Sequence, residues 1–319
     1  MDTKKIAIIG YGELGIAIYR LLRNKPGLII DVWDKRDNES KLGGIVSSVE
    51  VVFVCVPSWC AREALENIKK YLSKKTLVVC LSKGIEPADA SAVAKTMADK
   101  KAVAGKGKTL KTMDLVLEEI LGSKQPFAIL SGPMLAEELA SNKKGFAVFA
   151  SKRSKYFDAV SAVFSNTGLR IKYLRDLRGV ALCGVLKNIY SLGLGICDGL
   201  NLGSNTKGEL ALEAIKEMIE IVKYLGGKRE SVLSEAGAAD LIATAFSNFS
   251  RNREVGETLA KTGTCCLESE GYKSINSLIN LLGKKYLEYP LLTAIKRIVL
   301  DNKKPAESFS DLLKNESHI

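Results

Sequence analysis

The chain has 319 residues, of which 46% are hydrophobic, and 47 Lys and Arg against 36 Asp and Glu give a formal net charge of +11. This composition can bury a globular core over two domains, which argues against general disorder. The charge would attract anions such as nucleic acid, acidic lipid or small phosphorylated molecules, although a Lys-rich proteome would give the same balance. No nucleic-acid partner is expected, because neither zinc-finger spacing nor a basic stripe with interleaved aromatics occurs.

The seven cysteines are odd in number, form no C-x-x-C and mostly lie in apolar runs. They fit a reducing cytoplasm better than disulfides, and no metal site is expected. No signal peptide precedes the first strand-like run, which also favours the cytoplasm. The single histidine is His318, beside the C-terminus. An acid–base enzyme built from this chain must therefore move its proton with Lys, Asp, Glu, Tyr or Cys.

The first half alternates short apolar runs with helical patterns. Strands are predicted at 5–9, 28–33, 51–56, 76–81, 126–130, 146–150 and 169–174, and helices at 14–23, 61–72, 113–121 and 156–164. Segment 88–111 is predicted as a helix followed by a basic loop. The βαβα order predicts an α/β, Rossmann-like, doubly wound and mostly parallel sheet.

A glycine loop follows the first predicted strand. Gly10-Tyr11-Gly12-Glu13-Leu14-Gly15 matches G-x-G-x-x-G and opens an apolar helix. Gly10 would allow the tight turn, Gly12 the approach of a pyrophosphate and Gly15 close packing of helix on strand. The helix N-terminus would then bind the anion, unless the segment is an ordinary Gly-rich turn.

The second predicted strand ends in charged residues. Asp34 stands where a carboxylate can accept hydrogen bonds from the adenosine ribose and favours NAD. Lys35 and Arg36 could hold a 2′-phosphate and leave NADP open. The other interpretation is a solvated charge cluster in a turn.

Three later strands end in distinctive loops: Val56-Pro57-Ser58, Ser82-Lys83-Gly84 and Ser131-Gly132-Pro133. Ligands of open α/β sheets bind beyond the carboxyl ends of the strands. Lys83 therefore lies where a cation could meet substrate or nicotinamide, although it is one of many lysines.

After residue 176 the strand signals fade and helices with short connections follow. We place a dinucleotide-binding domain at 1–176 and an all-helical C-terminal domain at 177–319. Segment 179–197 is apolar enough to resemble a membrane span, but Lys187 lies inside it and Asp198 ends it, so a buried helix is predicted.

Two groups in the helical half carry candidate chemistry. Lys187-Asn188 lies in the apolar run, where desolvation lowers an ammonium pKa toward neutrality, unless the lysine occupies an exposed stripe. Asp240 and Thr244 share a helix face, so Asp240 could pair with a catalytic ammonium. Ser250-Arg251-Asn252 resembles a helix start that binds phosphate; the alternative is a capped helix with exposed basic residues.

Together these motifs resemble the NAD(P)-dependent glycerol-3-phosphate dehydrogenase family over nearly the whole chain. Further carriers are Asp198-Gly199-Leu200-x-Leu202-Gly203-x-Asn205-Thr206-Lys207 and Glu270-Gly271. The resemblance implies that Lys187 transfers the proton beside Asp240 and that Lys83 contacts substrate and cofactor. It also implies that Ala136, Arg251 and Glu270 lie near the cofactor, and that the substrate is surrounded by Gly132, Asn188, Thr244, Ser250, Arg251 and Asn252.

The expected reaction interconverts dihydroxyacetone phosphate and sn-glycerol 3-phosphate with NAD or NADP, and thereby supplies phospholipid synthesis. A homodimer is left open. Departures from the family are the short segment 37–49, Met134 in place of a Ser or Thr, Glu213 in place of an Arg, and Glu13-Leu14 in the glycine loop. Rival hypotheses are a reductase of another keto acid or phosphorylated ketone, such as ketopantoate, and a non-catalytic dinucleotide sensor.

Overall fold

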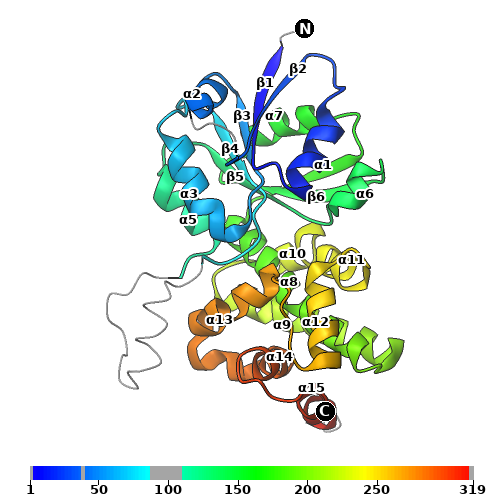
Figure 1. The fold of residues 1–319 in the computed structure, drawn as a ribbon. Helices are drawn as coiled ribbons and strands as arrows, with labels where there is room; N and C mark the ends of the chain where they lie inside the picture. The colour runs from blue at the N-terminus through cyan, green and yellow to red at the C-terminus, as the bar shows by residue number, and fades with distance from the viewer. Residues whose placement is uncertain (1–2, 37–39, 87–109, 316–319) are drawn as a thin grey trace.

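The computed structural model describes residues 3–36, 40–86 and 110–315, arranged as a sheet-containing half followed by a helical half (Figure 1). His318 and nearly all of the segment predicted at 88–111 lie outside these residues.

The sheet has seven strands in the order β2-β1-β3-β4-β5-β6-β7. All neighbouring strands are parallel except β5 and β6, so the predicted, mostly parallel sheet is confirmed. Every residue of β3, β4 and β5 is buried, because helices cover both faces of the sheet. The strands are β1 (Lys4–Ile9), β2 (Leu28–Trp33), β3 (Val51–Val54), β4 (Leu77–Cys80), β5 (Phe127–Ser131), β6 (Gly145–Ala150) and β7 (Leu169–Leu174).

The four helices predicted in this half are present, with ends shifted by three residues at most. Two short helices were not predicted, because five to seven residues carry too little periodicity to show a face: α2 (Ser40–Val46) and α6 (Ala136–Ala140). The predicted four are α1 (Glu13–Leu22), α3 (Ser58–Lys69), α5 (Met113–Leu121) and α7 (Lys155–Phe164).

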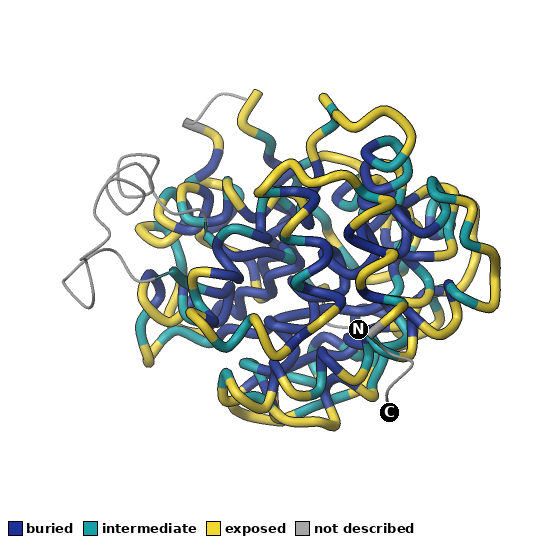
Figure 2. The backbone as a smooth tube through the Cα atoms, turned by 90° about the horizontal axis from the view of Figure 1, so that it is seen from below, coloured by how far each residue is buried: buried dark blue, intermediate teal, exposed yellow. Residues whose placement is uncertain are grey.

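The helical half is arranged around α8 (Leu177–Gly199), which is buried along nearly its whole length. It is long and apolar enough to cross a membrane, but its most apolar window is entirely buried within the protein, as predicted. Figure 2 shows the buried backbone gathered inside a rim of exposed segments. Packed against α8 are α9 (Gly203–Tyr224), α10 (Arg229–Val232), the π-helical turn η1 (Glu235–Ala239), α11 (Asp240–Phe246), α12 (Arg251–Thr262), α13 (Glu270–Leu282) and α14 (Pro290–Val299). The 3-10 helix η2 (Gly283–Glu288) packs on α13 and α14, and α15 (Pro305–Asn315) packs on α12 and α14.

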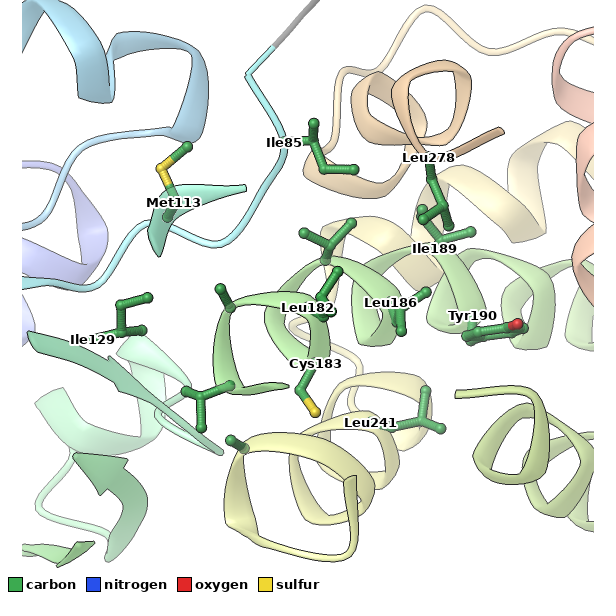
Figure 3. Packing of buried hydrophobic residues seen from close by; sticks show 14 of the residues in the cluster. Ile85, Met113, Ile129, Leu182, Cys183, Leu186, Ile189, Tyr190, Leu241 and Leu278 are labelled. Carbon is green, nitrogen blue, oxygen red and sulfur yellow. The ribbon is translucent and has the colours of Figure 1, made fainter. Parts of the chain in front are cut away.

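The two halves share one buried apolar cluster. It runs from α2, α3 and α5 on one face of the sheet into α8 and the helices around it. Figure 3 shows Met113 and Ile129 of the sheet half in this cluster with Leu182 and Cys183 of α8. The division at residue 176 stays a prediction, but the shared core fixes α8 against the sheet.

Candidate active site

The carboxyl ends of β1 to β5 meet at one edge of the sheet, as parallel strands must. The glycine loop, the Val56-Pro57-Ser58 segment, Lys83 and Gly132 follow β1, β3, β4 and β5 at this edge. Helix α8 packs against β5 there, and an added Cβ at Gly184 would lie 3.3 Å from the Lys83 side chain. The strand-end loops therefore face the helix that carries Lys187.

A cavity of about 280 Å³ opens beside the glycine loop. Gly10 has φ +94, and a Cβ there would come 2.6 Å from Val56, so this turn requires glycine. Gly12 begins α1 without a side-chain cap, and a Cβ on it would meet no atom within 4 Å. Free helix N–H groups facing open space suit a pyrophosphate. The cavity is lined by Gly10, Gly12, Trp33, Asp34, Lys35, Cys55, Val56, Pro57, Trp59, Cys60, Glu63, Ala64 and Asn67.

Asp34 connects this cavity to the glycine loop. Its Oδ2 accepts from the backbone N–H of Tyr11 at 2.9 Å, and its Oδ1 accepts from Nε of Arg36 at 2.6 Å. The hydrogen bond from Arg36 lowers the pKa of Asp34, so the carboxylate is ionised at neutral pH. A negative charge thus lies at the end of β2, where the sequence predicted a ribose contact.

The remaining predicted cofactor residues surround this region. Lys35 is exposed, Glu13 is exposed at the start of α1 beside the partly buried Leu14, and Gly15 is buried within α1. Ala136 is the first residue of α6.

The central feature of the site is a carboxylate between two ammonium groups. Lys83 Nζ lies 2.7 Å from Asp240 Oδ2 and donates to the carbonyl of Gly132 at 3.0 Å. Lys187 Nζ lies 3.3 Å from Asp240 Oδ1 and donates to Thr244 Oγ1 at 3.0 Å. The structure therefore brings together five of the predicted residues, from α8, α11 and two strand-end loops.

Burial sets the protonation of Lys187, which is only 7% exposed. Desolvation lowers the pKa of Lys187 to about 8, the carboxylate of Asp240 opposes this shift, and the charge of Lys83 adds to it. A pKa near the working pH suits a group that gives and takes a proton.

The predicted phosphate residues divide into a buried and an exposed part. Asn252 is buried and donates to Asn188 Oδ1 at 2.9 Å, and Asn188 donates to the Lys83 carbonyl at 3.3 Å. Ser250 caps α12 by accepting from the backbone of Arg253. Arg251 has a side chain 56% exposed and pairs with Glu254 at 3.9 Å.

One contact is missing from the sequence-based picture of the site. Ser58 was given no role, yet it donates to Glu270 from its backbone and its hydroxyl; its place in a strand-end loop was the signal available. Of the departures from the family, Met134 is buried in the core, and Glu213 accepts from Lys216 on α9.

Comparison with known proteins identifies the family of the chain. The model of the NAD-dependent glycerol-3-phosphate dehydrogenase N-terminus matches residues 37–157, and the model of the C-terminus matches residues 176–310. A glycerol-3-phosphate dehydrogenase [NAD(P)+] of Fusobacterium nucleatum is 30% identical over 97% of this chain and 96% of its own.

Solved structures agree as well. That of glycerol-3-phosphate dehydrogenase from Coxiella burnetii is 26% identical, with a TM-score of 0.82 over 98% of this chain and 99% of that one. The Saccharomyces cerevisiae glycerol-3-phosphate dehydrogenase is 19% identical, with a TM-score of 0.76 over 98% and 99%, and is similar in fold.

Proposed function

The chain belongs to the NAD-dependent glycerol-3-phosphate dehydrogenase family, and from this premise we propose how its own residues carry out the reaction. It is an NAD(P)-dependent oxidoreductase that interconverts dihydroxyacetone phosphate and sn-glycerol 3-phosphate and thereby supplies phospholipid synthesis. When bound, the nicotinamide supplies the hydride. The residues of the chain must then bind the ketone, orient it and give a proton to its oxygen.

The Lys187–Asp240–Lys83 cluster is the observation that carries this mechanism. Lys187 lies in a buried helix, and its side chain has a pKa of about 8. Its ammonium can therefore give a proton to the developing alkoxide and take it back in the reverse reaction. The same ammonium, which is buried, would stabilise the negative charge that develops on this oxygen. Asp240 pairs with both lysines, and through this shared carboxylate Lys83 would lie on the same side of the site and help to polarise the ketone oxygen.

We assign the substrate to the side of this cluster formed by α8, α11 and α12. Gly132, Asn188, Thr244 and Asn252 contact the lysines or one another and would surround the three-carbon skeleton. Ser250 and Arg251 begin α12, whose N-terminal N–H groups and guanidinium suit a phosphate. Phosphate binding far from the reacting carbon positions the carbonyl.

The substrate is tested by NADH oxidation with dihydroxyacetone phosphate, dihydroxyacetone, ketopantoate and hydroxypyruvate, in the parent and in Arg251→Ala. We expect the highest kcat/KM with dihydroxyacetone phosphate, and a KM raised at least ~10-fold by Arg251→Ala for this substrate alone, because charge-assisted bonds to phosphate are lost. A parent that prefers ketopantoate contradicts the assigned substrate. An equal rise in KM for dihydroxyacetone and for its phosphate would show that Arg251 does not bind the phosphate. Cofactor affinity is measured separately.

We expect NADH to be preferred over NADPH, because the ionised Asp34 would face a 2′-phosphate of roughly two negative charges. Like charges ~4 Å apart repel by about 4 kcal/mol per unit pair at an effective dielectric of about 20. Arg36 and Lys35 offset part of this, so discrimination is incomplete. The measurement is the ratio of kcat/KM for the two cofactors in the parent and in Asp34→Ala. The preference must move toward NADPH in the variant; an unchanged ratio means that Asp34 does not read the ribose.

We also place the enzyme in the cytoplasm, which is supported by seven free cysteines that form no disulfide with one another. We also propose a homodimer. The exposed apolar side chains of Ile242, Phe246 and Phe249 could form its interface. Sedimentation velocity separates it from a monomer.

A further inference from the structure

A largely buried ionic cluster lies where the end of α8 meets α9 and α12. The Asp198 carboxylate accepts from Lys207 Nζ at 2.8 Å and from Arg253 Nε at 2.6 Å, both through Oδ2. The side chains of Asp198 and Arg253 are each 20% exposed, and Lys207 is buried, so solvent screens these pairs weakly. Asp198 and Lys207 begin and end the 198–207 motif of the sequence, and the proposed function leaves both without a role.

Lys207 fixes the end of α11. Its Nζ donates to the carbonyl of Ala245 at 3.0 Å and lies 4.3 Å from the centre of the ring of Phe246, the last residue of α11. The last carbonyls of a helix have no partner within the helix, and a cation placed there satisfies them and interacts favourably with the helix dipole. The helix that carries Asp240 and Thr244 is therefore held at its end by α9.

Arg253 fixes the start of α12. Its guanidinium pairs with Asp198, and its Nη1 donates a long hydrogen bond of 3.5 Å to Asn248 Oδ1, in the loop before the helix. Its backbone N–H donates to the Ser250 hydroxyl at 3.2 Å. The side chain of Arg253 thus reaches back along the chain past the residues that we assign to the substrate phosphate, which are Ser250, Arg251 and Asn252.

Helix α12 also packs on α8 backbone to backbone. A Cβ on Gly195 of α8 would overlap the carbonyl oxygen of Arg253, and a Cβ on Gly256 of α12 would overlap the carbonyl oxygen of Leu192. Only glycine fits at these two positions, because the two helices cross in direct contact. Two kinds of contact therefore fix the start of α12: this close packing and the ionic pair with Asp198 at the end of α8.

We propose that Arg253 is a positioning residue, which acts through Asp198 to hold the start of α12 in the geometry that binds the phosphate of the substrate. This role rests on the proposed function. One carboxylate holds both ends of segment 245–253, because Lys207 connects the end of α11 to Asp198 and Arg253 connects the start of α12 to it. Arg251 lies inside this segment with an exposed side chain, so the helix start that carries it sets the place of its guanidinium.

The test is the reduction of dihydroxyacetone phosphate and of dihydroxyacetone by NADH in Arg253→Met, which removes the charge and keeps a long side chain. We expect KM for the phosphate to rise ~10-fold and KM for dihydroxyacetone to stay within about threefold of the parent, because the loss falls on bonds to the phosphate. The inhibition constant of inorganic phosphate, used as a competitor, should rise ~10-fold as well. In contrast, kcat should stay within about threefold of the parent, because Lys187 and Asp240 are held by contacts of their own.

A phosphate-specific effect would also follow if Arg253 contacted the phosphate itself, and Asp198→Asn separates the two roles. A positioning role predicts that Asp198→Asn raises KM for dihydroxyacetone phosphate at least ~3-fold, because a neutral partner holds the guanidinium about half as strongly. An unchanged or lower KM would mean that the released guanidinium binds the phosphate directly, and it would overturn the proposal.

Lys261→Met is the matched control. Lys261 lies about two turns further along α12 and pairs with Glu257, as Arg253 also does, so its loss should leave KM for both ketones unchanged. Thermal unfolding shows that each variant folds. If Arg253→Met does not fold, Arg253→Lys carries the test: a single ammonium cannot hold Asp198 and Asn248 together, so KM for the phosphate should rise ~3-fold.

Equal rises in KM for the two ketones in Arg253→Met, or no rise for the phosphate, would overturn the positioning role of Arg253. A parent that prefers ketopantoate would contradict the proposed function instead. With such a parent, the inhibition constant of inorganic phosphate still tests Arg253, because it measures phosphate binding without depending on which ketone is reduced.

Discussion

Replacing Lys187 by Ala is expected to lower kcat for dihydroxyacetone phosphate reduction by ~10²–10⁴-fold, the usual contribution of a general acid. NADH binding should stay nearly intact, because Lys187 contacts Asp240 and Thr244 rather than the glycine loop. Lys207→Ala is the matched control: Lys207 is equally buried, at 7% exposed, but pairs with Asp198.

The pH dependence of the parent follows from the same side chain. Reduction needs the protonated ammonium, so kcat should fall as pH rises through about 8, and oxidation of glycerol 3-phosphate should rise over the same range.

Turnover of Lys187→Ala within about threefold of the parent, or a Lys207→Ala variant that loses as much, would contradict a proton-transfer role for Lys187.

Asp240→Asn is expected to lower kcat/KM by ~10²–10³-fold. The change removes the charge that lies 2.7 Å from Lys83 and 3.3 Å from Lys187, and leaves the buried Lys187 and the partly buried Lys83 without the carboxylate between them. Breaking a buried ion pair costs about 3–5 kcal/mol. Part of this loss should lower the free energy of unfolding, and the rest should appear as weaker positioning of the two lysines in the site. Because the Asp240 carboxylate raises the pKa of Lys187 against desolvation, its loss should move the alkaline limit of reduction to lower pH.

The control for this variant is Asp198→Asn. It removes the carboxylate at the end of α8 that pairs with the buried Lys207 of α9. It should lower thermal stability without moving the alkaline limit. A limit that stays in place in Asp240→Asn would show that Asp240 does not set the protonation of Lys187.

The sequence by itself determined the sheet and the glycine loop, and it singled out Lys187 as a candidate for burial. Uninterrupted runs of Val and Ile predict strands covered on both faces, and the glycine spacing predicts a turn that only its context confirms. The apolar residues around Lys187 made a desolvated site one of two predictions, beside an exposed stripe, and the structure buries this lysine. These features are local, so neighbouring residues along the chain reveal them.

Only the tertiary structure decided which side chains meet. Lys83 and Asp240 are 157 residues apart, and no sequence period connects them; the packing of α11 and α8 against the edge of the sheet brings them to 2.7 Å. The sequence left Lys187 between a desolvated site and an exposed stripe, and left Asp240 as one candidate partner. The sequence placed Ser58 in a strand-end loop and Glu270 near the cofactor but could not pair them, because their 2.9 Å hydrogen bond depends on how α13 lies against α3 across the two halves. Distances of this kind are set by the packing of whole helices, whereas the sequence pattern specifies only which face of each helix is buried.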